Sequence, residues 1–270
     1  MQVDRSRIDA IYLTLNSSKL TTYGPQCDAF VAAVRQLLNR QPPAGWEYIQ
    51  SSESTVVAKC LDPAFAYYKE YLGRSLLEGI KGLFRGSRCE RARTQSQLLI
   101  EHGFRSPSIL CWGHYRKQEF MITEGIAGLG FTKYIYTHWQ RPLPKAELRL
   151  KRSIIDALAR EIGRLHKAGI VHGDLRLDNI LFETSDGKPV FYLIDNERNR
   201  KYRRIPRRLV KKNLVQVNMV LPEVVTNTDR LRFFQTYNKV YGRFTANGQR
   251  TMGRRVSKKT WQRLRGKSYP

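Results

Sequence analysis

The chain has few acidic side chains and no long apolar run. No segment approaches ~20 consecutive apolar residues, which excludes a transmembrane helix. Because the N-terminus lacks a basic start followed by an apolar stretch, we do not expect a signal peptide. The four cysteines, Cys27, Cys60, Cys89 and Cys111, form no CxxC pair. We therefore expect reduced thiols rather than a zinc site or a disulfide framework.

Basic residues outnumber acidic ones by 48 to 23 in the 270-residue chain, giving a net charge of +25. The excess is concentrated toward the C-terminus, since from Asn196 onward 21 Lys and Arg residues stand against three acids. A charge of this size predicts a polyanionic partner, which is nucleic acid, an anionic membrane surface or a phosphorylated glycolipid. No feature indicates a stable protein partner. The hydrophobic content of 41% is ordinary for a globular protein.

Apolar patterning divides the chain into a β-rich part and a helical part. Five short β-like runs predict an antiparallel sheet, at 46–50, 55–61, 65–71, 109–113 and 119–123. One helix is predicted over 88–102, between these runs, and the clearest amphipathic helix spans 147–167.

We predict an α+β, bilobal organisation. Residues 1–124 would form an N-terminal segment and a β-rich, nucleotide-binding N-lobe with one main helix. Residues 125–245 would form a mostly helical C-lobe that carries the catalytic loop. Residues 246–270 read as a basic tail with the composition of a disordered segment.

The segment Ile170–Arg200 contains the pattern of a phosphoryl-transfer site. Asp174 is followed five residues later by Asn179, and Asp195 ends an apolar strand. Phosphoryl transfer needs a carboxylate that accepts or orients the hydroxyl proton, and hard oxygen ligands that hold Mg²⁺. A lone His-Gly-Asp often sits in a turn, and an Asp after a strand is often a cap. The joint spacing nevertheless favours a kinase-type site with ATP and Mg²⁺ as cofactors.

The pattern assigns roles to these residues. Asp174 is the predicted catalytic base, and Asn179 and Asp195 are the predicted metal ligands. Arg176 lies where a cation could meet the transferring phosphate, so the catalytic set is Asp174, Arg176 and Asn179. His172 is expected to orient the loop through hydrogen bonds.

Nucleotide-binding residues are predicted upstream. Lys69 ends a β-like run, where a phosphate-anchoring Lys is expected, and Glu90 on the next helix would pair with it. The alternatives are an exposed strand Lys and a solvent-facing helix Glu. Glu124 falls where a hinge would offer backbone groups to adenine. Ser52 and Ser54 stand where a G-x-G-x-x-G phosphate loop is absent, and their amides and hydroxyls could bind phosphate.

These motifs resemble the protein-kinase-like superfamily, and more closely the Kdo and heptose kinase (WaaP-like) family of lipopolysaccharide core kinases in Gram-negative bacteria. The resemblance spans roughly Val56 to Tyr241. It rests on the motifs YYKEYLGRS, LLIEHGF after Glu90, HGDLRLDNIL, YLIDNERNR and DRLRFFQTY. It implies a protein-kinase-like fold and ATP-dependent phosphorylation of a sugar hydroxyl in the lipopolysaccharide inner core. It also implies a peripheral location on the cytoplasmic face of the inner membrane.

Two departures favour a glycolipid over a peptide acceptor. Asn196 and Glu197 follow Asp195 in place of Phe-Gly, and no Ala-Pro-Glu segment follows. A run in which nine of fifteen residues are basic (198–212) comes next, so Arg198, Arg200 and Lys201 are candidate substrate-binding residues. The alternatives are a kinase of another small alcohol or of a protein Ser, and a pseudokinase-like module that binds nucleic acid.

Overall fold

The computed structural model describes residues 20–51, 53–62, 64–72, 86–116 and 118–265. The chain divides into two compact units. The sheet unit comprises residues 1–94 and 107–126, and the helical unit comprises residues 95–106 and 127–270. Helix α4 (Arg88–Glu101) begins in the sheet unit and ends in the helical unit. The sequence placed a boundary near residue 124 and did not separate 95–106.

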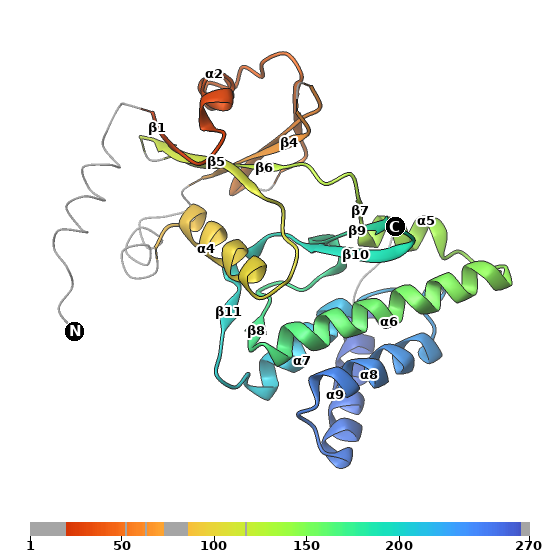
Figure 1. Cartoon of the computed structure of the whole chain (residues 1–270). Helices are drawn as coiled ribbons and strands as arrows, with labels where there is room; N and C mark the ends of the chain where they lie inside the picture. The colour runs from red at the N-terminus through yellow and green to blue at the C-terminus, as the bar shows by residue number, and fades with distance from the viewer. Residues whose placement is uncertain (1–19, 52, 63, 73–85, 117, 266–270) are drawn as a thin grey trace, which may run out of the picture. The chain divides into compact units, whose positions relative to one another are not determined.

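A six-stranded antiparallel sheet with the order β1-β5-β6-β4-β3-β2 forms the sheet unit (Figure 1). Its strands are β1 (Thr21–Tyr23), β2 (Trp46–Ile49), β3 (Thr55–Cys60), β4 (Ala66–Tyr71), β5 (Ile109–Tyr115) and β6 (Gln118–Glu124). The five predicted runs are β2 to β6. Strand β1 was not predicted, because three residues are too few to show an alternating pattern.

The two faces of β4 pack against different partners. Ala66 and Tyr68 join a core with helix α2 (Cys27–Leu38), whereas Tyr71 joins a smaller cluster with Cys89 of α4. Successive strand residues point to opposite faces, so Lys69 lies on the same face as Tyr71.

Glu70 is a fully buried carboxylate on the α2 side of β4. It accepts hydrogen bonds from both terminal nitrogens of Arg40, at 2.6 and 3.0 Å. Gln118 Nε2 donates at 2.9 Å and the Tyr68 hydroxyl at 3.1 Å. These four donors compensate the cost of burying the charge.

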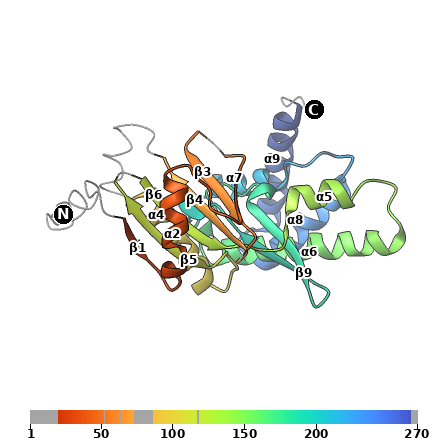
Figure 2. The same ribbon diagram turned by 90° about the horizontal axis from the view of Figure 1, so that it is seen from above.

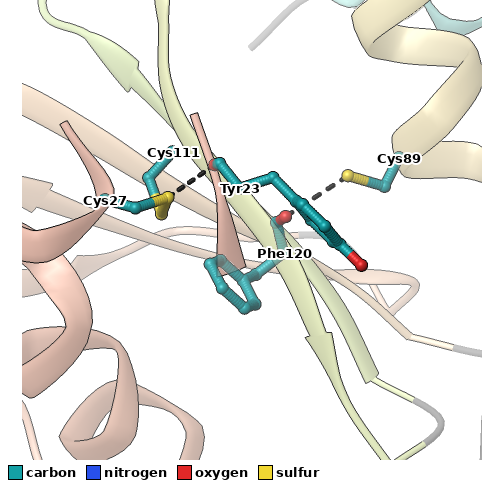
Figure 3. Close-up of a disulfide and its surroundings, with 5 residues drawn as sticks. All are labelled: Tyr23, Cys27, Cys89, Cys111 and Phe120. Carbon is teal, nitrogen blue, oxygen red and sulfur yellow. Dashed lines mark hydrogen bonds between the residues drawn. A yellow bond between two sulfur atoms is a disulfide. The ribbon is translucent and has the colours of Figure 1, made fainter. Parts of the chain in front are cut away.

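Cys27 and Cys111 form a disulfide that ties α2 to β5 (Figure 3). Our expectation of four reduced thiols is therefore wrong for this pair. The two cysteines are 84 residues apart, and only the packing of α2 on the sheet brings them together. Cys60 and Cys89 are buried thiols, and Cys89 donates to the Phe120 carbonyl at 3.2 Å.

The helical unit combines two small antiparallel sheets with a bundle of helices (Figure 2). Its strands are β7 (Leu129–Gly130), β8 (Ile170–Val171), β9 (Ile180–Ser185), β10 (Lys188–Leu193) and β11 (Arg200–Lys201). Its helices are α5 (Phe131–His138), α6 (Lys145–Lys167), α7 (Arg207–Val217), α8 (Asn227–Tyr241) and α9 (Ala246–Arg265), with short 3₁₀ turns η1 (Leu177–Asn179) and η2 (Asn196–Arg198). Strands β10, β9 and β7 form one antiparallel sheet, and β11 pairs with β8.

The apolar face of α6 lies at the centre of the helical core. Ile154, Ile162 and Leu165 are fully buried, as the amphipathic pattern predicted. Helices α6 and α8 lie side by side (Figures 1 and 2). Among the described helices, none combines the length and the apolar composition needed to cross a membrane.

The expected basic tail differs from the structure, because residues 246–265 form helix α9. Met252, Val256, Thr260 and Leu264 recur at every fourth position and are buried. Four apolar or small side chains along one stripe are enough to dock a helix, although the segment is poor in large apolar groups overall. The prediction of a tail rested on composition, which does not show the spacing of the few apolar residues.

Candidate active site

The predicted catalytic loop connects β8 to η1, and hydrogen bonds of His172 fix its course. The fully buried His172 accepts from the Asp174 amide through Nδ1 (3.1 Å) and donates to the Ile194 carbonyl through Nε2 (3.1 Å). Burial lowers the pKa of His172, which keeps the imidazole neutral and suits this pair of bonds. The predicted orienting role of His172 agrees with this geometry.

Both carboxylate oxygens of Asp174 have side-chain partners. Arg176 contacts Oδ2 through Nε at 3.0 Å and through Nη2 at 2.7 Å. Gln216 on α7 donates from Nε2 to Oδ1 at 2.6 Å. The Asp174 side chain remains 29% exposed, so an acceptor hydroxyl can reach it.

Asn179 and Asp195 are neighbours through the backbone. The Asn179 side-chain amide donates to the Asp174 carbonyl at 2.8 Å, which directs Oδ1 away from that carbonyl. Ile194, just before Asp195, donates its amide to the Asn179 carbonyl at 3.1 Å. The structure thus brings the predicted metal ligands to the same part of the helical unit. Asp195 has left-handed backbone angles (φ 59°, ψ 46°), a conformation that non-glycine residues adopt at some cost and that recurs at functional sites.

Asn196 anchors the segment after Asp195, a role that the sequence did not indicate. Its buried amide nitrogen lies 3.0 Å from Ser96 Oγ, Ser106 Oγ and the Leu193 carbonyl. Its Oδ1 accepts from Asn199 Nδ2 at 3.0 Å, and Asn199 Oδ1 accepts from the Gly173 amide at 3.0 Å. The only sequence signal was two Asn residues three apart, because the Ser partners are remote in the chain.

The basic run begins beside the catalytic loop. A Cβ on Gly173 would overlap the backbone and Cβ of Arg198, so these two residues are in close contact. Arg200 and Lys201 form β11, paired with Val171 and Ile170, and Lys201 Nζ lies 2.8 Å from His102 Nε2. Arg198 and Arg200 are exposed.

Lys69 and Glu90 both belong to the sheet unit, and the predicted pairing between them stays a prediction. Lys69 Nζ lies 5.6 Å from the centroid of the Tyr71 ring. Glu90, in the first turn of α4, is exposed. The ion pairs found among the described residues do not include one between these two side chains.

The other predicted nucleotide-binding residues lie at two ends of the sheet. Glu124 ends β6, where its Oε1 accepts from the Ser108 amide and hydroxyl at 2.7 and 2.8 Å. The backbone amides of Glu124 and Gly125 donate to the carbonyls of Ser108 and Phe65, so neither amide is available to adenine. Ser54 is buried between β2 and β3, with its carbonyl bonded to Arg88. Ser52 lies outside the described residues.

The oxygen donors of Asn179 and Asp195 fit a magnesium ion. Mg²⁺ is usually held by one or two protein oxygens together with phosphate oxygens and water. Among the described residues, no group of three or more His, Cys, Asp or Glu side chains could hold a metal ion. Two protein oxygens of this kind would suit an ion that is shared with a phosphate substrate.

The fold is of the protein-kinase-like class. The sequence model described as "Lipopolysaccharide kinase (Kdo/WaaP) family" matches residues 97–237, just over half of the chain. The chain belongs to this family. The resemblance drawn from HGDLRLDNIL and DRLRFFQTY is confirmed.

Individual relatives agree with this assignment. The chain is 32% identical over 130 residues to the lipopolysaccharide core heptose(I) kinase WaaP of Pseudomonas aeruginosa, an alignment that covers 45% of this chain and 47% of that protein. It is 42% identical over 50 residues to the EKC/KEOPS complex subunit BUD32 of Yarrowia lipolytica, which covers 18% and 19% of the two chains. The solved structure of WaaP in complex with acyl carrier protein has a TM-score of 0.59 at 21% identity, covering 88% of this chain and 98% of that one.

Proposed function

We propose that this protein is an ATP- and Mg²⁺-dependent kinase that transfers the γ-phosphoryl group to a sugar hydroxyl of the lipopolysaccharide inner core. The observation that carries the proposal is Asp174, a partly exposed carboxylate held at both oxygens within a catalytic loop. Membership of the lipopolysaccharide kinase family supports a sugar acceptor.

Each candidate site residue of the helical unit has a distinct role in this reaction. Asp174 accepts the proton of the acceptor hydroxyl while the hydroxyl oxygen forms a bond to the γ-phosphorus of ATP. The bond between that phosphorus and the bridging oxygen breaks, and ADP leaves. Arg176 holds the carboxylate in place and adds positive charge beside it. Asn179 and Asp195 would bind Mg²⁺, which when bound neutralises phosphate charge. In the sheet unit, Lys69 would bind phosphate as a point charge.

The basic residues beside the catalytic loop would bind an anionic acceptor. Arg198 contacts Gly173, one residue before Asp174, and its side chain is 66% exposed. Lys212 of α7 donates to the Gly173 carbonyl at 2.6 Å, which adds a second cation at this position. Phosphates or sugar carboxylates of a glycolipid would complement these charges.

We also propose peripheral binding to the cytoplasmic face of the inner membrane. Helix α9 has seven exposed cations and no acidic residue: Arg250, Arg254, Arg255, Lys258, Lys259, Arg263 and Arg265. Each cation near an anionic membrane contributes ~1 kcal/mol, so this helix could hold the protein there without a lipid anchor. Sedimentation with anionic and with neutral vesicles tests this binding. Equal binding to both, or none to either, would contradict it.

The central experiment incubates the purified protein with γ-labelled ATP, Mg²⁺ and extracted lipopolysaccharide. We expect label on a core sugar, located by mass spectrometry of the released core. Label found only on protein or on a small alcohol would instead support a different acceptor.

Two substitutions assign the roles. Asp174→Ala should abolish transfer without changing the fold, and Asp195→Ala should remove Mg²⁺-dependent nucleotide binding. Asp178→Ala is the matched control, because this exposed carboxylate lies between them in sequence and should leave the rate within about twofold. Full activity of Asp174→Ala would remove the catalytic assignment.

Two other partners follow from specific observations. The charge of +25 could hold nucleic acid, and the affinity of such binding would fall steeply and linearly with the logarithm of the salt concentration.

The similar solved structure is of WaaP with acyl carrier protein, so a protein partner is also a candidate. Co-elution of acyl carrier protein with the purified chain on size exclusion would support it.

A further inference from the structure

We infer that Gln216 is a positioning residue for the catalytic Asp174, and that it forms the last link of a buried hydrogen-bond chain in the helical unit. The inference rests on the proposed kinase activity for its functional part. The sequence motifs do not include Gln216, which lies 42 residues beyond Asp174 on α7. The proposed reaction assigns no role to Gln216, and its contacts in the structure are what indicate one.

Gln216 contacts the catalytic loop at two points. Nε2 donates to Asp174 Oδ1 at 2.6 Å, the shortest hydrogen bond that this carboxylate makes. Oε1 accepts from the Leu175 amide at 3.3 Å and from Asn213 Nδ2 at 3.1 Å. Gln216 is 8% exposed, so water does not compete strongly for these bonds.

The neighbours determine which way the Gln216 amide faces. Leu175 N–H and Asn213 Nδ2 can only donate, so the atom they meet must be the oxygen. The other end of the amide is therefore the NH₂ group, and it must face the Asp174 carboxylate. If the Gln216 amide were reversed, its NH₂ group would face the Leu175 amide and Asn213 Nδ2, which are also donors. Its oxygen would then face the Asp174 carboxylate, which is also an acceptor. The orientation is thus set by the network, not by a choice between similar atoms.

The same logic extends the chain inward. Asn213 Nδ2 also donates to the His172 carbonyl at 2.8 Å, so Asn213 Oδ1 is the end that meets His166 Nε2 at 3.1 Å. His166 must therefore carry its proton on Nε2, and its Nδ1 accepts from the Tyr237 hydroxyl at 2.8 Å. Burial lowers the pKa of His166 to about 4, which agrees with a neutral ring.

Every donor in this chain points toward Asp174. The order is Tyr237 on α8, His166 on α6, Asn213 and Gln216 on α7, and then the carboxylate. Hydrogen bonds aligned in one direction polarise each other and strengthen the last bond. The chain therefore holds one Asp174 oxygen against three helices, while Arg176 holds the other from the exposed side.

The decisive variant is Gln216→Glu. It preserves the shape and the oxygen that Leu175 and Asn213 need, and it replaces the amide donor with a carboxylate oxygen. That oxygen either repels Asp174 or shares a proton with it, and both weaken Asp174 as a base. We expect kcat to fall by about 10- to 100-fold, the effect of losing a charge-assisted hydrogen bond that orients the base. Because Gln216 contacts the carboxylate and not a nucleotide-binding residue, we expect the Kd for ATP·Mg²⁺ to stay within twofold.

Gln249→Glu is the matched control. It makes the same change of charge at a half-buried Gln on α9 that donates to the Phe244 carbonyl, and it should leave kcat unchanged. A loss of ATP affinity equal to the loss of kcat in Gln216→Glu would indicate general damage and overturn the inference. So would wild-type kcat in Gln216→Glu.

A second measurement does not depend on activity. In ¹⁵N-labelled protein, the side-chain NH₂ resonance of Gln216, assigned through its loss in Gln216→Glu, should shift strongly in Asp174→Asn and not in Asp178→Asn. An unmoved resonance would show that the contact is absent in solution. If the wild type transfers no phosphate but the resonance shifts, the proposed function fails while the contact stands.

Discussion

At the scale of single residues, Gly173 has no tolerance for a side chain. A Cβ there would overlap the backbone and Cβ of Arg198, and the neighbouring Asp174 could not keep its place. We expect Gly173→Ala to cost ~1–3 kcal/mol in unfolding free energy and to reduce kcat at least tenfold. The control is Gly130→Ala, where an added Cβ meets no atom within 4 Å. Equal stability and rate for both variants, in denaturant unfolding and transfer assays, would contradict this account.

The site shows which single residues a sequence can disclose. That Asp174, Asn179 and Asp195 lie near one another was predictable, because their spacing reflects one local loop and hairpin. The contacts of Gln216 and Asn196 were not predictable, because Gln216 reaches Asp174 from α7 and Asn196 meets Ser96 of α4 and Ser106. The contact of Asn199 with Gly173 likewise joins residues that are 26 positions apart. Polar residues that act through tertiary contacts have no fixed spacing from the residues they serve.

At the scale of elements, a buried ion pair joins α6 to α8. Lys151 Nζ lies 2.9 Å from Asp229 Oδ2, with side chains 1% and 8% exposed, and it also donates to the Val224 carbonyl at 2.6 Å. Asp229 completes a capping box with Thr226 at the start of α8. Because removing one partner leaves a buried charge, we expect Lys151→Ala to destabilise the fold by ~3–5 kcal/mol.

Arg164→Ala is the comparison for that prediction. Arg164 pairs with Glu161 at 2.8 Å on the same helix, but its side chain is 51% exposed. We expect a change below ~1 kcal/mol in urea unfolding. Similar costs for the two variants would mean that burial of the Lys151 pair has no special weight.

The cysteines allow a second test at this scale. The structure pairs Cys27 with Cys111 and leaves Cys60 and Cys89 as thiols. Denatured protein should therefore show two reactive thiols without reductant and four with it, by titration with a thiol reagent. Four reactive thiols in freshly purified, unreduced protein would contradict the disulfide and support our first expectation of four reduced cysteines.

Elements differed in how well they could be predicted. The strands β2 to β6 and helices α4 and α6 followed from clear alternation or helical periodicity. The strands β1, β7, β8 and β11 have two or three residues each, too few for any period. Helix α9 was missed because its buried stripe is diluted by cations, and the disulfide was missed because sheet register is not visible in spacing.

At the scale of the whole molecule, buried histidine should make stability depend on pH. Burial lowers the pKa of His166 from 6.5 to about 4, so the unfolded chain binds more protons than the folded one between these values. The contribution of neutral His166 is complete above pH 6.5 and is lost as pH falls to about 4. It amounts to roughly 3 kcal/mol. His172, whose pKa burial also lowers, acts in the same direction.

The variant His166→Gln isolates this effect. Its deficit in unfolding free energy relative to the wild type should be largest above pH 6.5 and should shrink toward pH 4. Denaturant unfolding at steps of one pH unit measures it. A deficit that does not change with pH would show that His166 is not buried and neutral.

The hydrogen-bond chain from Tyr237 to Asp174 also constrains how this protein can change over evolution. Each of its members donates in one direction, so replacing one by a side chain of opposite polarity leaves two donors or two acceptors facing each other. Substitutions at Tyr237, His166, Asn213 and Gln216 should therefore occur together or not at all. We therefore expect these four positions, which lie on three different helices, to vary together among related sequences.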